Sequence, residues 1–305
     1  MRGVELSRRY FEQYGMPCLR EQFPELLGSV AAGVCGQGSE NFGFDDEISR
    51  DHDFDPGFYL WLPGEIYRKW EFRLSRAYDR LPEEFEGVAL IGKSVYENAR
   101  HGVRETGAFF ESLTGFRGLP PTNAAWLAVP SFRFASAVNG EIFYDGAGEV
   151  TQLRRLLASP PEDVWNKLLA RALVFAAQSG QYNLPRLLKR GETGGAALAL
   201  SEYVKAVCEV LFLLNRRWAP FYKWLIRGAK ALPELGALAA EAEALLLSPV
   251  CAGTADRAEA LGAKLAEALR SRGLTACRSD FLEPHAYEIF ARIEDPALKG
   301  MHIME

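Results

Sequence analysis

The residues of this chain that are best suited to chemistry lie in one short stretch, "GSENFGFDDEISRDHDF" (38–54). Gly38 and Ser39 open the stretch, and Asp51 and Asp53 follow after a spacer of eleven residues. A glycine lets an anion approach the backbone closely, and a serine adds an N–H and a hydroxyl at the same place. Gly38 and Ser39 are therefore the candidate phosphate-binding residues.

Asp51 and Asp53 have the spacing of a metal-binding pair. On a strand, residues i and i+2 project from the same face, so the two carboxylates would converge. Like charges this close repel each other unless a cation neutralises them. Mg²⁺ or Mn²⁺ would do so and would leave coordination positions free for phosphate oxygens. His52 would point to the opposite face, which favours a structural role for it.

The same stretch can also be interpreted as a solvated acidic loop, because Asp-x-Asp and Gly-Ser pairs are common in loops. Asp45, Asp46 and Glu47 fit that interpretation, and we expect them to solvate the loop or to cap a helix. The order of features nevertheless favours a site. An apolar strand, Gly-Ser, a short spacer, Asp-x-Asp and a second apolar strand follow one another.

The elements expected around this stretch are strands and helices in mixed order. Small apolar residues predict a strand over 29–35, and alternation predicts another over 58–62. A helix over 4–28, interrupted at Pro17, should precede them, and a helix over 63–82 should follow. Val103 begins a predicted strand that gives way to a helix over 108–113, closed by Gly115. A last strand over 142–144 follows an Asn-Gly turn.

The chain changes character near residue 150, because Leu, Ala, Glu, Lys and Arg dominate from there on. Helical spacing occurs over 152–158, 161–180, 196–218, 220–230, 235–247, 254–272 and 279–294. We therefore expect an α/β domain over residues 1–150 and an all-α helical-bundle domain over residues 151–305.

Composition excludes several classes of protein. A formal net charge of −5 in 305 residues gives no overall basic field, which argues against bulk DNA binding. The five cysteines are scattered and suggest neither a disulfide framework nor a zinc motif. The N-terminus lacks a signal-peptide core, and no run of 18 apolar residues occurs. We expect a reduced, cytoplasmic protein without membrane contact.

The acidic stretch resembles the signature of the polymerase-β-type nucleotidyltransferase superfamily. The long string "GSENFGFDDEISRDHDF", together with "LLNRRWAPFYKW" (213–224), is similar to one bacterial branch of it. That branch is a domain of unknown function similar to the small-molecule nucleotidyltransferases that inactivate aminoglycosides. The resemblance covers most of the chain, with the signature in the first half.

The resemblance implies an α/β (α+β) nucleotidyltransferase domain with a small mixed sheet. It implies that Gly38 and Ser39 hold a triphosphate, with ATP as the expected substrate, and that Asp51 and Asp53 bind Mg²⁺ or Mn²⁺. A nucleoside monophosphate would pass to an acceptor hydroxyl, releasing pyrophosphate. Such a transfer needs mainly positioning and charge neutralisation. The acceptor would be a small molecule, or a protein or RNA.

The superfamily places a third carboxylate on a neighbouring strand. Glu105 is the first choice for this catalytic and metal-binding role, because it lies where the predicted strand meets its helix. Glu141 and Asp145, around the next predicted strand, are the alternatives. If none of them lines up with the pair, the two-metal mechanism is put in doubt, and the activity with it.

Lys223, in the downstream string, is the expected phosphate ligand, although it could equally be a helix-end cation packed beside Trp224. Glu202, Lys205 and Glu209 recur on one helical face. That face could be plain solvent-facing surface, or one of its glutamates could deprotonate the acceptor.

Two other functions remain open. One is a non-catalytic nucleotide-binding or regulatory module of the same fold, and the other is a metal-dependent phosphohydrolase. The sequence identifies neither the acceptor, nor the preferred nucleotide, nor the oligomeric state.

Overall fold

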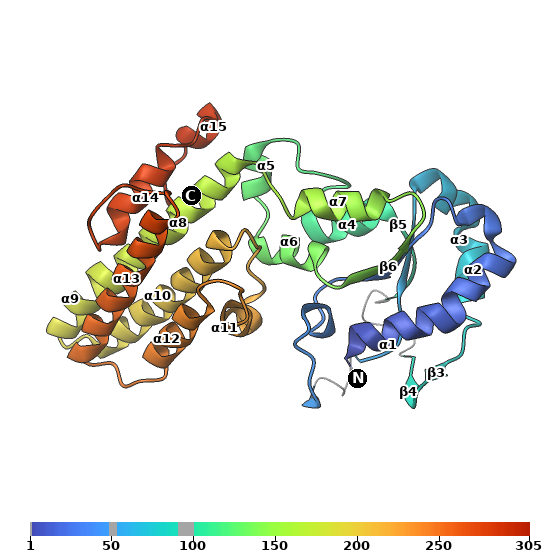
Figure 1. The fold of residues 1–305 in the computed structure, drawn as a ribbon, viewed down its shortest axis with the longest axis horizontal. Helices are drawn as coiled ribbons and strands as arrows, with labels where there is room; N and C mark the ends of the chain where they lie inside the picture. The colour runs from blue at the N-terminus through green and yellow to red at the C-terminus, as the bar shows by residue number, and fades with distance from the viewer. Residues whose placement is uncertain (1, 49–53, 91–100) are drawn as a thin grey trace. The chain divides into compact units, whose positions relative to one another are not determined.

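A computed structural model describes residues 2–48, 54–90 and 101–305 of the chain (Figure 1). The fold is mixed α/β, as expected, with a small mixed sheet and many helices. Its contacts form two compact units. The first is Met1–Pro120 with Arg133–Ala158, and the second is Pro121–Phe132 with Ser159–Glu305.

The first unit is built on a four-stranded sheet. The strand order is β5 (Gly102–Glu105), β2 (Tyr59–Leu62), β1 (Ala31–Val34), β6 (Glu141–Asp145). β1 is antiparallel to both of its neighbours, and β5 runs parallel to β2. The four strands expected from the sequence are all present, near their predicted positions.

One face of this sheet packs against the N-terminal helices and α3 (Gly64–Tyr78). Along the strands, alternate residues such as Val34, Leu60 and Val103 point into this core. The predicted helix over 4–28 is α1 (Gly3–Tyr10), a π-helical turn η1 (Phe11–Gly15) and α2 (Met16–Gln22). The backbone stays helical through Pro17, which directly follows the π-helical turn and its wider bond from the Met16 N–H to the Phe11 carbonyl.

The opposite face of the sheet is aromatic. Tyr59 and Trp61 stack on each other along β2, and Phe109 packs against both. Phe109 lies on α4 (Thr106–Thr114), which ends at Gly115 with a φ of 85°. This is the predicted glycine stop, in a left-handed conformation that suits glycine.

Among the described residues between 79 and 148, four elements were not predicted. A two-stranded hairpin is formed by β3 (Glu84–Phe85) and β4 (Val88–Ala89). Two short helices, α5 (Asn123–Leu127) and α6 (Ser131–Val138), follow α4. The first unit ends with α7 (Glu149–Leu157), which contains residue 150.

The second unit is entirely helical among its described elements. Its longer helices are α8 (Glu162–Ala176), α10 (Thr193–Leu214), α11 (Tyr222–Lys230), α12 (Gly236–Leu246), α13 (Ala252–Ser271) and α14 (Leu282–Phe290). α8 continues through a π-helix, η5 (Ala177–Asn183), into α9 (Leu184–Lys189), and α15 (Pro296–Lys299) lies near the C-terminus. The helix predicted over 161–180 therefore extends beyond its expected end.

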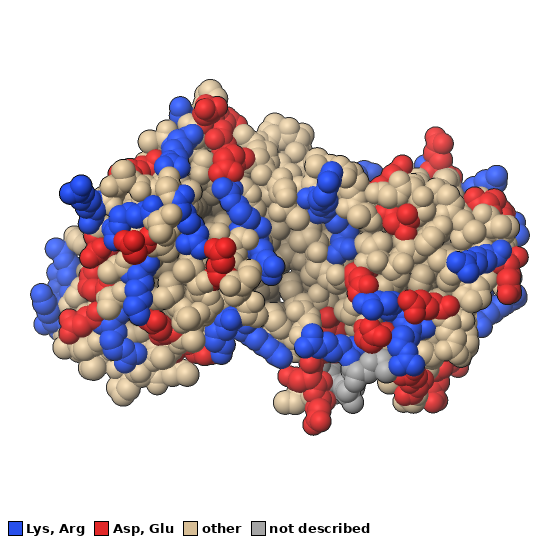
Figure 2. All heavy atoms as spheres, viewed as in Figure 1, with Lys and Arg blue, Asp and Glu red and all other residues tan. Residues whose placement is uncertain are grey.

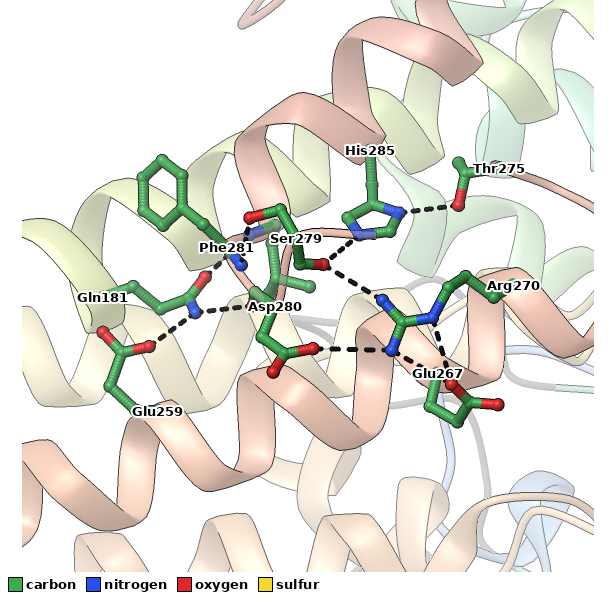
Figure 3. A network of polar contacts seen from close by, with 10 residues as sticks. Gln181, Glu259, Glu267, Arg270, Thr275, Ser279, Asp280, Phe281 and His285 are labelled. Atoms are coloured by element: carbon green, nitrogen blue, oxygen red, sulfur yellow. Dashed lines mark hydrogen bonds and ion pairs between the residues drawn. The ribbon is translucent and has the colours of Figure 1, made fainter. Parts of the chain in front are cut away.

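A buried polar network ties η5 to the C-terminal helices (Figure 3). Gln181, on η5, donates from its amide nitrogen to Glu259 Oε2 at 2.8 Å and to the Asp280 carbonyl at 2.9 Å. Its amide oxygen accepts from the Leu282 N–H at 2.9 Å. One side chain thus links α13, the loop after it and the start of α14.

His285 is a structural member of the same network. Its ring is fully buried, with Nε2 2.8 Å from the Ser279 carbonyl oxygen and Nδ1 2.6 Å from Thr275 Oγ1 (Figure 3). Because a carbonyl oxygen only accepts, Nε2 carries the proton and Nδ1 accepts from the Thr275 hydroxyl. The ring therefore holds the α13–α14 loop in place.

Positive and negative residues are interspersed on the visible face of the molecule (Figure 2). Along the parts of the chain that the structure describes, no helix combines the length and the apolar character needed to span a bilayer.

Candidate functional site at one edge of the sheet

The Gly38-Ser39 turn follows β1 and is braced by a second turn. The Gly36 N–H donates to Asn139 Oδ1 at 2.9 Å, and Asn139 Nδ2 donates back to the Gly36 carbonyl at 2.7 Å. The Gly140 N–H donates to the Asn41 carbonyl at 2.8 Å. Gly140 has a φ of 64°, so the predicted Asn-Gly turn has the conformation expected of it.

The turn itself presents unused donors. The Ser39 hydroxyl and the N–H groups of Gly38 and Ser39 have no hydrogen-bond partner within the described ranges. Ser39 precedes η3 (Glu40–Phe42), a three-residue 3₁₀ helix. So short a helix adds little dipole, and the backbone and hydroxyl donors are what could bind an anion.

An acidic side chain lies directly over this turn. A Cβ atom placed on Gly38 would lie 1.8 Å from Glu40 Oε1, so the carboxylate occupies the space that any side chain at position 38 would fill. Asn41 Nδ2 also donates to Glu40 Oε1, at 3.1 Å. The glycine thus leaves room for this carboxylate, and a phosphate could occupy the same place only after Glu40 had moved away.

The predicted metal ligands Asp51 and Asp53, with His52 between them, lie outside the described residues. The described residues on either side of them lead out of β1 and into β2. β1 and β2 are antiparallel neighbours, with Gly33 opposite Tyr59. The chain leaving β1 toward Gly38 and the chain entering β2 therefore meet at the same edge of the sheet.

An unpredicted acid–base pair lies at this edge. Asp55 Oδ1 accepts from His101 Nε2 at 2.6 Å and from the Gly57 N–H at 2.7 Å, and the Asp55 side chain is only 3% exposed. The imidazole packs on the Gly57 backbone, where a Cβ would lie 2.2 Å from His101 Cδ2. His101 Nδ1 is buried and has no partner among the described residues.

The pair was missed because its members are far apart in the sequence. One signal was available: Asp55 continues the i, i+2 alternation of Asp51 and Asp53, so it belongs to a longer acidic pattern. His101 immediately precedes β5, whose first residue, Gly102, lies beside Tyr59. The parallel strands β2 and β5 thus both begin at this edge, with Asp55 shortly before β2 and His101 directly before β5.

Glu141 also lies at this edge, because it pairs with Val34 at the end of β1. Its carboxylate accepts a hydrogen bond from the guanidinium of Arg8, on α1, and this bond raises the pKa of Arg8. Among the three acids considered for the third carboxylate, Glu141 is the one that begins its strand beside the Gly38-Ser39 turn.

Glu105 lies at the opposite edge. It ends β5 and pairs with Leu62, the last residue of β2. Its carboxylate caps α4 by accepting from the N–H groups of Gly107 at 3.0 Å and Ala108 at 2.7 Å, and it also pairs with Arg117. Both oxygens are thus occupied, and the structure does not bring Glu105 to the edge that carries Gly38.

Asp145 is at that opposite edge too. It pairs with Ala31 at the start of β1, and its carboxylate accepts from the Thr151 N–H of α7 at 2.8 Å. Like Glu105, it serves a helix N-terminus, where an acid is favourable.

Glu105→Ala is expected to destabilise the protein by about 1 kcal/mol, the usual cost of losing an N-cap. Burial raises the pKa of Glu105. The N–H groups of Ala108 and Gly107 and the Arg117 guanidinium lower it by more than burial raises it, so the pKa lies below its usual value. The stabilisation should therefore be present above the unfolded-state pKa and disappear as the pH falls through the folded-state value. Urea unfolding from pH 7 to pH 3 measures this. Glu111→Ala, which removes an exposed partner of Arg117 but no cap, is the control. Equal effects of the two changes would contradict the capping role.

Two other acids of the stretch have structural roles. Asp45 Oδ2 accepts from the Gly3 N–H at 2.8 Å, at the start of α1, so it serves a helix N-terminus as expected. Asp46 Oδ1 accepts from the Ile48 N–H at 3.1 Å within the loop.

No group of three or more His, Cys, Asp or Glu side chains that could hold a metal ion occurs in residues 2–48, 54–90 and 101–305. The described acids at the site edge are already paired, Asp55 with His101 and Glu141 with Arg8. A metal site here would therefore depend on Asp51 and Asp53.

The remaining predicted residues belong to the second unit. Lys223 lies in the first turn of α11, exposed, with Nζ 5.2 Å from the centre of the Trp224 ring. Glu202 and Lys205 form an exposed pair on α10, with Nζ 3.4 Å from Oε1. Glu209 lies on the same helix and is half-buried, and burial raises its pKa against the opposing effects of Lys205 and Arg171.

Glu209→Gln is expected to stabilise the protein at pH 8. A carboxyl whose folded-state pKa is raised favours folding when protonated, and this contribution is lost as the pH rises through the folded-state pKa. The amide cannot ionise, so the variant should melt higher than the wild type at pH 8, and the difference should shrink toward pH 4. Thermal melts across this range test it. A lower melting temperature at pH 8 would indicate that the ionised form makes a stabilising contact.

Comparison with known proteins gives one match. A family model described as a domain of unknown function (DUF4037) matches residues 126–225. The matched segment includes α8, α10 and Lys223, and it does not include the Gly38–Asp53 stretch. No curated protein and no solved structure matches the chain.

Proposed function

We propose that the protein is a metal-dependent nucleotidyltransferase. It would move a nucleoside monophosphate from a nucleoside triphosphate, with ATP as the expected donor, to an acceptor hydroxyl. The bond between the α-phosphorus and the bridging oxygen breaks, the acceptor oxygen forms the new bond to that phosphorus, and pyrophosphate leaves while the acceptor loses its proton. The finer fold proposed with it is a nucleotidyltransferase-like domain followed by a helical bundle.

One observation carries the proposal: the antiparallel pairing of β1 with β2. It brings the turn with free donors at Gly38 and Ser39 to the same end of the sheet as residues 54–58, through which the chain enters β2. Phosphoryl-type transfer depends mainly on holding the polyphosphate and neutralising its charge. The Glu40 carboxylate lies against Gly38 and would have to turn away before a phosphate could bind in its place.

The proposed roles follow from that arrangement. Gly38 and Ser39 would hold phosphate oxygens, and Asp51 and Asp53 would hold Mg²⁺ or Mn²⁺, which neutralises charge on the polyphosphate. Glu141 replaces Glu105 as the favoured third carboxylate, because it begins its strand at the site edge, and it would exchange its bond with Arg8 to bind a metal. Lys223 stays a proposed phosphate ligand.

The test uses purified protein, Mg²⁺ or Mn²⁺, and each of the four ribonucleoside triphosphates labelled at the α- or the γ-phosphorus, with and without a cell extract. Nucleotidyl transfer predicts that the α-label moves to a component of the extract and that the γ-label appears in pyrophosphate. Mass spectrometry of the labelled component identifies the acceptor as a small molecule, a protein or an RNA.

Other outcomes would replace the proposal. Release of labelled phosphate or nucleoside monophosphate without an acceptor would identify a phosphohydrolase. Binding of a triphosphate without turnover would identify a nucleotide-binding module. If no triphosphate binds in the presence of either metal, the site interpretation is wrong.

A further inference from the structure

A pocket of about 220 Å³ lies within the second unit, away from the residues discussed so far. It is partly open to solvent and is lined by α8, the C-terminal end of α10 and the segment that follows α13. Leucines form its apolar wall, and three polar side chains and one indole complete the lining. The lining residues are Trp165, Asn166, Leu169, Leu213, Leu214, Arg216, Arg272 and Leu274.

Asn166 is a buried amide that the fold leaves unpaired. The residue is 7% exposed, and its side chain makes no hydrogen bond with any residue that the structure describes. The Asn166 amide is not among the fully enclosed unpaired polar atoms of the described residues, so it stays accessible from the pocket. Its donor and acceptor line the pocket, where a bound molecule could satisfy both.

Arg216 occupies a position that favours glycine. α10 ends with paired bonds, from the Arg217 N–H to the Phe212 carbonyl and from the Arg216 N–H to the Leu213 carbonyl, both at 3.0 Å. In this motif the residue at position 216 is left-handed, and its φ is 53°. A side chain there costs free energy that glycine would not. The guanidinium reaches the pocket and lies 5.8 Å from the Trp165 ring centre.

The present partners of the two arginines are exposed. Arg216 makes two bonds of 2.7 Å with Glu162, whose side chain is 61% exposed. Arg272 pairs with Glu234, which is 64% exposed, and donates to the Ala268 carbonyl at 3.2 Å. Exposed ion pairs contribute about 1 kcal/mol or less, and bidentate pairs such as Arg216 with Glu162 are the stronger ones. Because both glutamates are exposed, they could turn into solvent when an incoming anion takes their place on the arginines.

We propose that this pocket binds a small amphipathic carboxylate. Its apolar body would lie against the leucines and Trp165, Asn166 would pair with a polar group, and the carboxylate would accept from Arg216 or Arg272. A guanidinium matches a carboxylate with two parallel bonds, which makes this head group the fitting one. The inference does not depend on the proposed nucleotidyl transfer.

The experiment measures binding of defined probes to the full chain by ligand-observed NMR. The probes are butyrate, hexanoate, octanoate, benzoate and phenylacetate, each matched with the corresponding primary alcohol. We expect at least one acid to bind with a Kd below about 1 mM, and its alcohol to bind at least about tenfold more weakly. If none of the acids binds, or if acids and alcohols bind equally, the proposal is wrong.

Two variants separate a binding role from a structural one. Asn166→Leu keeps the approximate shape and removes the unpaired amide, so it should melt no lower than the wild type while losing at least about tenfold in affinity. Arg216→Gly restores the favoured residue at the left-handed position and should likewise fold but bind weakly. Lys264→Gln, which removes an exposed cation elsewhere in the unit, should change neither property. Unchanged affinity in Asn166→Leu, or a lower melting temperature, would overturn the assignment.

Discussion

The Asp51→Asn, Asp53→Asn double variant is expected to lose at least about 10³-fold of its nucleotidyl-transfer rate, corresponding to about 4 kcal/mol of transition-state stabilisation. Asparagine keeps the size of each side chain but removes the negative charges that would hold a divalent cation. The measurement is pyrophosphate release at saturating triphosphate and metal, together with metal binding by calorimetry. The fold should persist, because removing two neighbouring like charges relieves repulsion.

Asp46→Asn is the matched control, since it makes the same chemical change in the same acidic stretch. Asp46 bonds to the Ile48 N–H within its loop, so its loss should leave the rate within about twofold of wild type. If both variants lose the same fraction of activity, the acids contribute only general negative charge, and the assignment of Asp51 and Asp53 as a metal-binding pair is wrong.

Gly33→Ala is expected to destabilise the first unit by about 3 kcal/mol. A Cβ at this position would lie 2.3 Å from the Glu141 carbonyl oxygen and 2.9 Å from Ile142 Cα. Both are backbone atoms of β6, so no side chain can move aside, and the sheet itself must open. β1 and β6 already shift register between Ala32 and Gly33. Chemical denaturation monitored by circular dichroism measures the loss.

Gly28→Ala provides the comparison. A Cβ at Gly28 would meet no atom within 4 Å, so this change should alter stability by less than about 0.5 kcal/mol. Similar melting temperatures for both variants would show that β1 and β6 do not pack as closely as described. The Gly33 variant should also weaken triphosphate binding, because the turn carrying Gly38 follows β1 directly.

Local patterns in the sequence predicted most of the first unit's strands and the major helices. Alternation identified β2, and the glycine after α4 ended that helix where expected, because both signals depend only on neighbouring residues. The short helices α5 and α6 have too few turns to show a period. The continuation of α8 past its predicted end depends on a π-helix, whose wider hydrogen-bonding pattern leaves no clear sequence signature.

The candidate site was predicted less completely, and strand direction explains why. Glu105 is a carboxylate at the end of a strand, as a third metal ligand requires. However, β5 runs parallel to β2, so the last residue of β5 lies far from the turn after β1. The Asp55–His101 contact joins residues 46 positions apart in the chain. Pairings of this kind arise from tertiary structure, which no local spacing reveals.

The π-helix η5 makes the packing of the second unit sensitive to the insertion or deletion of a residue within a continuous helix, where no loop can absorb the change. A π-turn accommodates one residue more than an α-turn, and each residue of an α-helix turns the side chains by about 100°. Deleting one residue between Ala177 and Asn183 would allow α8 to continue regularly into α9, but it would rotate everything on one side of the deletion. Gln181 would then face away from Glu259 and Leu282, and the core faces of the two helices would no longer align. Lineages of this protein should therefore tolerate substitutions in this helix far more readily than a change in its length.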